Sequence, residues 1–382
     1  MEKEYSRNKI DCSRALSVAE ILIIKRDFNL LIKIATQLLA EIQTQLTPYT
    51  ALFCYESIEY LKKKGQNIDI QQTSRYSIKD IRQKAKFFDF RVNKLLQSID
   101  NIDCLQNDYF IGLMRYPELG SWNLHDNLGI TFDDEKNIVG NTHYAYYVFQ
   151  DDKSISKPHE KMSGHEIIGT EVRDFACDMG RIIGSISSAL NCIGDFVVAD
   201  FDSSKISLHT QDFNTNRCTT AGNEKYKTIR LFLLHVLSSI GLVLFILKKA
   251  IIRESGLLLK FEYITYHYAL LRLDGLAHLC ASKPEVFSDT KLVSLLNSID
   301  YQNENNLRKT EFRNCIMHFA LTDKLGNSLI AGDKFDLSIP LCGLVESQFN
   351  MSYSEYKSKL EKQLLSIYQQ IKEYLAFNLS LD

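Results

Sequence analysis

The chain has few residues that break helices and little excess charge of either sign. Its 382 residues include only 5 prolines, whereas leucine, isoleucine and lysine are frequent, and this balance favours helix. The 45 lysines and arginines nearly balance the 47 aspartates and glutamates, which leaves a formal net charge of −2. Because no basic field covers the whole chain, any binding of nucleic acid must depend on a local patch.

The sequence also lacks paired cysteines. Its 9 cysteines are odd in number, are scattered along the chain and include no Cys-x-x-Cys pair. This pattern argues against a disulfide framework or a zinc site and indicates reduced thiols. The charged N-terminal segment, MEKEYSRNKID, does not have the pattern of a signal peptide. We therefore expect a cytoplasmic protein.

Motifs for nucleotide or metal chemistry are missing or incomplete. The sequence has no glycine-rich loop of the P-loop or Rossmann type. The His-Glu pairs at His159 and His165 lack the i,i+4 histidine spacing of a helical zinc site and are interpreted as a solvated loop. The segment from Asp202 to Lys205 is one residue too long for the Asp/Glu-x-Lys motif of metal-dependent nucleases and is interpreted as a hairpin turn. We expect neither a metal nor another cofactor.

One apolar run approaches the length of a membrane span. Residues 231–247 carry no charged side chain unless His235 is protonated, and cationic residues flank both ends. The run is at the short end for a span, and no second run accompanies it. We therefore predict a buried helix in the core of a helical bundle and no membrane contact. A membrane-linked effector that uses this run is the alternative.

The hydrophobic periodicity predicts a mainly α fold with a small antiparallel β element. In the N-terminal part, β-prone residues at 129–132 and 143–149 flank a turn, a polar loop follows at 151–163, and a second short hairpin is expected over 196–208. Helices are predicted at 14–47, 49–64, 77–98 and 165–193, with a break at Thr47-Pro48 and an N-cap at Ser77.

A polar segment at 211–224 predicts a domain boundary. Residues 1–215 would form an N-terminal α+β region with a regulatory or sensor role, and residues 216–382 a helical bundle. An irregular insertion is expected at 323–351, and Ser352 and Glu355 have the spacing of a capping box. The predicted helices of the bundle are 225–253, 257–281, 305–322 and 353–377.

The residues with the clearest chemical signal are Arg313, Asn314 and His318, in the segment FRNCIMHF. In a helix, Asn314 and His318 lie one above the other, and Arg313 is long enough to reach them. Histidine exchanges a proton near neutral pH, and the planar fork of arginine suits phosphate oxygens. Because RNA brings its own nucleophile, the 2′-hydroxyl, such a site needs no metal.

The same helical winding predicts what surrounds the motif. The apolar residues of 312–320 would close the core of the protomer, whereas Met317 and Leu321 would lie on the motif's face, where a partner chain could cover them. Two other arginine-to-histidine spacings, ending at His235 and His278, lie in strongly apolar helices and are interpreted as core-edge residues. A contribution of either histidine to the site is left open.

The motif resembles the Arg-Asn-x-x-x-His signature of HEPN ribonucleases, over about residues 225–382. The resemblance implies a helical bundle, a homodimer in which two motifs meet, and catalytic roles for Arg313, Asn314 and His318. It implies metal-independent RNA cleavage by a toxin or abortive-infection protein of prokaryotic defence, with an antitoxin or an activating ligand as a further partner. Ala320 stands where toxins paired with a nucleotidyltransferase often carry tyrosine, which argues against that subgroup.

The expected products are a 2′,3′-cyclic phosphate and a 5′-hydroxyl. Arg308 and Lys309, just before the motif, are expected to contact the RNA backbone. The alternative from another class is a non-catalytic helical protein that dimerises or binds RNA as a scaffold. A further alternative is that Arg313 and His318 merely solvate a helix face.

Overall fold

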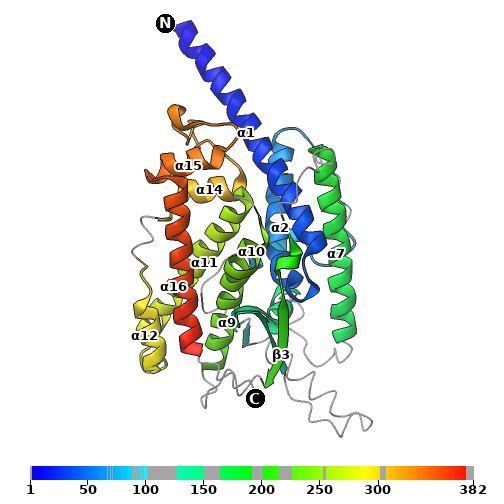
Figure 1. The fold of residues 1–382 in the computed structure, drawn as a ribbon, viewed down its shortest axis with the longest axis vertical. Helices are drawn as coiled ribbons and strands as arrows, with labels where there is room; N and C mark the ends of the chain where they lie inside the picture. Colours follow the sequence, from blue (N-terminus) through cyan, green and yellow to red (C-terminus); the bar gives the residue numbers. More distant parts are fainter. Residues whose placement is uncertain are drawn as a thin grey trace.

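The computed structural model is mainly helical and carries one small three-stranded antiparallel sheet, as the sequence predicts (Figure 1). The structure describes residues 2–66, 72–87, 127–149, 164–191, 201–214, 226–252, 255–301 and 307–375, together with 68, 70 and several positions between 92 and 100. The predicted polar loop at 151–163 and the beginning of the predicted second hairpin lie outside these described residues.

The first two helices break at a different place from the one predicted. α1 (Glu2–Gln37) and α2 (Ala40–Lys63) are separated at Leu38 and Leu39, where Leu39 adopts an extended backbone. Pro48 lies inside α2 instead of ending a helix, so the predicted break at Thr47-Pro48 is wrong. A proline removes only one helical hydrogen bond, and α2 continues past Pro48 with Leu46, Tyr49 and Leu52 buried in the core.

The next helix starts where predicted and ends early. α3 (Ile78–Lys84) begins behind Ser77, whose hydroxyl accepts a hydrogen bond from the Asp80 N–H at 3.1 Å, which confirms the N-cap. The predicted helix to residue 98 is interrupted because Phe87 has a left-handed backbone, with φ of 46°, while its ring is buried. α7 (Gly164–Ala189) confirms the helix predicted at 165–193.

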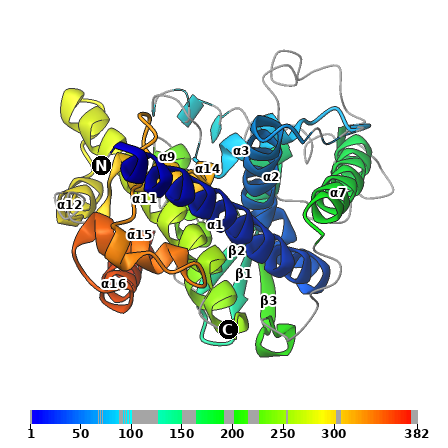
Figure 2. The same ribbon diagram turned by 90° about the horizontal axis from the view of Figure 1, so that it is seen from above.

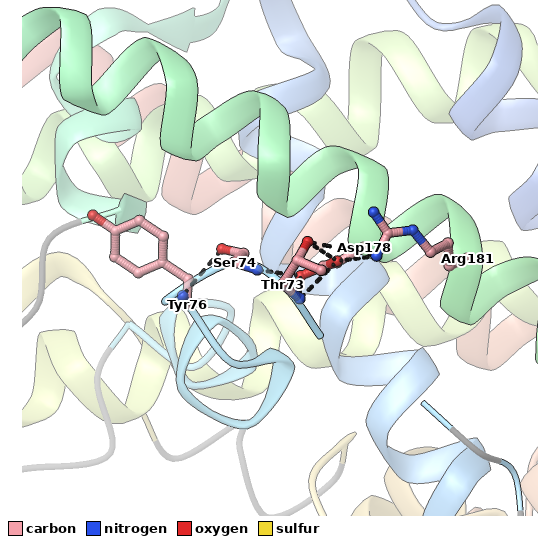
Figure 3. A network of polar contacts seen from close by, with 5 residues as sticks. All are labelled: Thr73, Ser74, Tyr76, Asp178 and Arg181. Carbon is pink, nitrogen blue, oxygen red and sulfur yellow. Dashed lines mark hydrogen bonds and ion pairs between the residues drawn. The ribbon is translucent and has the colours of Figure 1, made fainter. Parts of the chain in front are cut away.

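The segment before α3 is tied to α7 by the buried carboxylate of Asp178 (Figure 3). This carboxylate accepts hydrogen bonds from the N–H groups of Thr73 and Ser74, the latter at 2.7 Å, and pairs with Arg181 at 2.9 Å. Burial alone would raise the pKa of Asp178, but these hydrogen bonds and the charge of Arg181 lower it. The network thus joins the connection between α2 and α3 to α7.

The sheet has the order β2-β1-β3, with both pairs antiparallel. β1 (Asn127–Asp133) and β2 (Ile138–Asn141) form a hairpin whose first strand and turn match the prediction, but whose second strand lies before the predicted 143–149. The Asp133 carboxylate accepts hydrogen bonds from two N–H groups of the turn. β3 (Leu208–Asn214) pairs with β1, so the beginning of the predicted polar boundary segment is a strand. Residues Ser203–Lys205 form a single 3₁₀ turn, η4, capped by Asp202.

The predicted strand at 143–149 is wrong. This segment is α5 (Thr142–Phe149), and the side-chain oxygen of Asn141 accepts from the Tyr144 N–H at 2.9 Å at its start. Its aromatic residues favour strands by composition, but Tyr144 and Tyr147 are buried as helix residues in the core.

Three of the four helices predicted in the C-terminal part are present with similar bounds. α9 (Lys227–Gly241), the π-helical η6 (Leu242–Leu247) and α10 (Lys248–Ala250) cover the predicted 225–253. α11 (Gly256–Ser282) and α16 (Tyr353–Leu375) match two others, and Ser352 accepts from the Glu355 N–H at 3.2 Å as a capping residue does.

Other parts of the C-terminal region depart from the prediction. α12 (Thr290–Ser298) was not expected, and the predicted irregular insertion contains α15 (Pro340–Phe349) and a 3₁₀ turn, η7 (Gly332–Lys334). A Cβ on Gly343 would lie 2.1 Å from the carbonyl oxygen of Lys334. This glycine therefore serves a close contact within a helix and does not mark a loop.

The apolar run is a core helix. The helix over Lys227–Ala250 could cross a membrane by length and composition, but 83% of its apolar stretch is buried inside the protein. β2 packs so closely on it that a Cβ on Gly241 would lie 2.0 Å from the Ile138 carbonyl oxygen.

Seen from above, α1 runs across the other helices, with α7 on one side and α12, α15 and α16 on the other (Figure 2). Buried residues from both sides of position 215 belong to one hydrophobic core, and α1 packs against α11 while α2 packs against α14. The boundary segment itself lies mostly outside the part of the chain that the structure describes. The division at residue 215 stays a prediction.

Candidate functional site

The motif helix, α14 (Thr310–His318), is shorter than the predicted 305–322 and packs against α2, α11 and α15. Its apolar side is buried as expected, through Phe312, Cys315 and Ile316. The Phe312 ring meets the Tyr263 ring of α11 edge-on, with centroids 4.8 Å apart, and the Phe349 ring of α15 at 4.9 Å. These contacts fix the helix on which the motif stands.

Met317 and Leu321 do not lie on the open face of the motif, contrary to the prediction. Both are buried within the protomer, and the Met317 sulfur lies 3.3 Å from the Tyr268 hydroxyl. The helix ends at His318 because Phe319 turns left-handed, with φ of 57°, so helical winding no longer applies at Leu321. A partner chain therefore has no apolar surface to cover at these two positions.

His318, the last residue of α14, is held by a carboxylate of α2. Its side chain is 43% exposed, and its Nδ1 lies 2.7 Å from Oε2 of Glu56, which is buried. The other Glu56 oxygen accepts from Arg82 of α3 at 2.9 Å. The Arg82 guanidinium lies over the Tyr55 ring, 3.9 Å from its centroid. We call these four residues the His318 cluster.

The contact with Glu56 assigns different roles to the two imidazole nitrogens. An ionised carboxylate only accepts hydrogen bonds, so the proton of a neutral His318 ring is on Nδ1. Nε2 then carries the lone pair and can accept a proton from a bound molecule. This is the state that a general base requires.

Arg313 and Asn314 form the second part of the motif. A terminal nitrogen of Arg313 donates to the Asn314 side-chain oxygen at 2.9 Å, while the Arg313 Nε is buried without a hydrogen-bond partner among the described residues. At about 100° per residue, Arg313 and His318 lie about 140° apart around the helix. Asn314 lies between them, so the structure brings Arg313 to Asn314 and directs His318 toward α2.

His267 lies near the motif although the sequence motif does not indicate it. Its ring stacks on Tyr263 at 5.8 Å and meets Tyr268 edge-on at 4.9 Å, and these two tyrosines contact α14. Burial and the positive charges of Arg308, Arg313 and Arg272 lower the pKa of His267 to about 3. A neutral imidazole therefore lies among guanidinium groups. The spacing of residues along the sequence does not indicate His267, because this residue belongs to α11 and comes near the motif only where α11 packs against α14.

The two histidines left open by the sequence lie elsewhere. His235 is buried in the core, with its Nε2 2.9 Å from Nδ1 of His143. The His278 side chain is 81% exposed on α11 and lies 3.6 Å from Asp274. The structure thus gives both residues partners other than the motif.

The two predicted RNA-binding residues precede α14. The Lys309 ammonium donates to the Gln348 carbonyl oxygen and lies 5.4 Å from the centroid of the Phe349 ring. Arg308 is half-buried, close enough to His267 to lower its pKa. Their contact with RNA stays a prediction, and Lys309 would have to leave its present partner to make it.

The chain matches no protein-family model, no curated protein and no solved structure. The chemistry open to the site therefore follows from its own geometry. It offers a partly exposed proton acceptor, a guanidinium with an amide beside it, and a buried carboxylate that orients the acceptor. These groups suit the binding of a phosphate and the removal of a proton from a hydroxyl.

Proposed function

We propose that this protein is a metal-independent RNA endonuclease of the HEPN type. The observation that carries the proposal is the imidazole of His318, partly exposed and bonded through Nδ1 to buried Glu56, on the same short helix as the Arg313–Asn314 pair. A histidine that only solvates a helix face has no need of a buried carboxylate partner. The alternative of a merely solvated motif is therefore less favoured.

In the proposed reaction, Nε2 of His318 takes the proton of the RNA 2′-hydroxyl. The 2′-oxygen attacks the adjacent phosphorus, and the bond from phosphorus to the 5′-oxygen breaks. The 5′-oxygen takes up a proton from water or from His318 of a second copy of the chain. Arg313, from one or both copies, binds the phosphate oxygens as their charge develops. The products are a 2′,3′-cyclic phosphate and a 5′-hydroxyl.

The biological setting follows from the motif alone. We propose a cytoplasmic homodimer that acts as a toxin or abortive-infection effector in prokaryotic defence, controlled by an antitoxin or an activating ligand. Arg308 and Lys309 would contact the RNA backbone next to the cleaved bond. Residues 1–215 would keep a regulatory role in addition to supplying the partners of His318.

The test is incubation of the purified protein with total RNA in EDTA. The wild type is expected to release fragments with 5′-hydroxyl ends, which a polynucleotide kinase labels without prior dephosphorylation. His318→Ala should lower the rate by a factor of about 10²–10⁴ because the proton acceptor is lost. His278→Ala, a change at an exposed histidine of α11, is the matched control and should cleave like the wild type.

Two results would contradict the proposal. One is undiminished RNA turnover by a folded His318→Ala protein. The other is tight RNA binding by the wild type without cleavage, with binding weakened by Arg313→Ala, which would favour the non-catalytic RNA-binding scaffold. Circular dichroism of each variant shows whether the fold is kept.

A further inference from the structure

We infer that Glu56 is a positioning residue for His318, so that α2 of the N-terminal region completes a site whose motif lies in the C-terminal bundle. This inference rests on the proposed ribonuclease function, because it assigns the origin of the reactive state of His318. It gives residues 1–215 a direct part in the chemistry, although their sequence carries no catalytic motif.

The geometry fixes the tautomer. Oε2 of Glu56 lies 2.7 Å from Nδ1 of His318, within the range of a charge-assisted hydrogen bond. The Glu56 side chain is only 6% exposed, so water competes little for the contact. A carboxylate behind an imidazole holds the ring in one orientation and stabilises the charge that appears when the ring takes a proton.

Glu56 is itself held in place. Its Oε1 accepts a hydrogen bond from Arg82 at 2.9 Å, and the Arg82 guanidinium lies over the Tyr55 ring. With His318 at Oε2, both carboxylate oxygens have a fixed partner. Only 12% of the Arg82 side chain is exposed. A nearly buried ion pair is seldom the most stable filling of such a space, since apolar side chains often serve as well or better. Its presence next to His318 points to a role in the site.

The backbone at the end of α14 does not depend on Glu56. The Leu321 N–H is bonded to Glu20 of α1, and the Phe319 ring is buried. Removing the charge of Glu56 should therefore leave the helix end in place and change only the imidazole. This separates a positioning role from a structural one.

The test uses the full chain with Glu56→Gln, which keeps the shape of the side chain. We expect kcat to fall by about 10- to 100-fold while KM changes less than about twofold, because the lost interaction acts on the reacting state. Histidine ¹⁵N NMR spectra should show the Nδ1-protonated tautomer for His318 in the wild type and a mixture of tautomers in the variant. Glu59→Gln, at a half-buried glutamate of the same helix, is the control and should change neither readout.

Arg82 provides a second, independent variant. If it acts only through Glu56, Arg82→Gln should show a smaller loss of kcat, and the double variant should be no slower than Glu56→Gln alone. Additive losses would mean that Arg82 acts on RNA by itself and would overturn this part of the inference.

The outcomes separate this inference from the proposed function. If the wild type does not cleave RNA, the function fails, and the tautomer of His318 still reports whether Glu56 positions it. If the wild type cleaves and folded Glu56→Gln keeps the same kcat and tautomer, the inference is overturned while the function stands. An Nε2-protonated His318 in the wild type would overturn the inference even if Glu56→Gln failed to fold.

Discussion

The carboxylate of Glu20 in α1 accepts a hydrogen bond from the Leu321 N–H at 2.9 Å, just beyond the end of the motif helix. Its other oxygen accepts from the Tyr60 hydroxyl at 2.7 Å, and the side chain is buried. The Lys260 ammonium lies over the neighbouring Phe319 ring, 4.1 Å from its centroid, and pairs with buried Asp27 of α1. α1 thus holds the end of the motif helix from two points along its length.

We predict that Glu20→Ala destabilises the whole protein. The change leaves the Leu321 N–H and the Tyr60 hydroxyl without their acceptor in a buried place, and each unpaired group costs about 1–3 kcal/mol. The free energy of unfolding, measured in urea, should therefore fall by about 2–5 kcal/mol. Tyr60→Phe removes only the hydroxyl and should cost less than half as much. Equal losses for the two variants would show that the bond to Leu321 adds nothing.

We predict that Arg313→Lys severely impairs RNA cleavage. Lysine keeps the positive charge, but it lacks the planar fork that donates to Asn314 and is expected to bind the phosphate. The loss in kcat should be about 10²-fold, as for removal of one donor to a developing anion. Arg173→Lys on α7, where the arginine is exposed, is the control. Equal rates for wild type and Arg313→Lys would mean that charge alone suffices.

Helical periodicity was sufficient for most of the architecture. The apolar stripe of α16 and the apolar runs of α9 and α11 are long, so their prediction depends little on tertiary packing. The short elements failed where packing decides: the segment 143–149 has strand-forming aromatic residues, but Asn141 caps it as a helix. The sequence predicts a break at Pro48, but α2 accommodates this proline.

The sequence reveals some residues of the candidate site, whereas others become visible only in the fold. Arg313, Asn314 and His318 are visible in the sequence because they share one helix. Glu56 is 262 residues from His318, and no spacing rule connects two residues so far apart before the fold is known. The predicted exposure of Met317 and Leu321 failed because winding alone does not show where α14 ends or that Tyr268 of α11 covers its last turn.

We predict that the buried pair of His143 and His235 makes the fold sensitive to acid. Burial, with a smaller effect of the Lys227 charge, lowers the pKa of His143 to about 3, and burial beside His143 lowers the pKa of His235. The ordinary histidine pKa in an unfolded chain is about 6.5. The unfolded state therefore binds more protons below this pH, and stability falls as the pH drops from about 6.5 toward 3.

The measurement is the free energy of unfolding in urea between about pH 6 and pH 4.5. His143→Asn keeps a polar atom near the Nδ1 position and removes one titrating group. For this variant, the slope of the free energy of unfolding against pH should be lower than that of the wild type by up to about 1.4 kcal/mol per pH unit. Carboxylates that titrate in this range affect both proteins alike. His209→Asn, at an exposed position of β3, should keep the wild-type slope, and an unchanged slope for His143→Asn would contradict the prediction.

The last prediction concerns assembly, because the two parts of the motif face different directions within one protomer. The Arg313 charge acts on Tyr263 and His267 of α11, whereas His318 contacts Glu56 of α2. This arrangement suits a site in which the arginine of one chain meets the histidine of the other across a two-fold axis. We expect a homodimer at micromolar concentration by light scattering. A monomer under these conditions would exclude a shared site.

A heterodimer of Arg313→Ala and His318→Ala protomers, isolated with two different affinity tags, tests the shared site directly. Each homodimer should be inactive, since every site in it lacks either the arginine or the histidine. In the heterodimer one of the two sites combines the intact arginine of one chain with the intact histidine of the other, so activity should return to about half the wild-type rate. A two-tagged dimer in which both protomers carry His318→Ala controls for contamination and should stay inactive. If arginine and histidine act within one chain, the heterodimer has no complete site and stays as inactive as its parents.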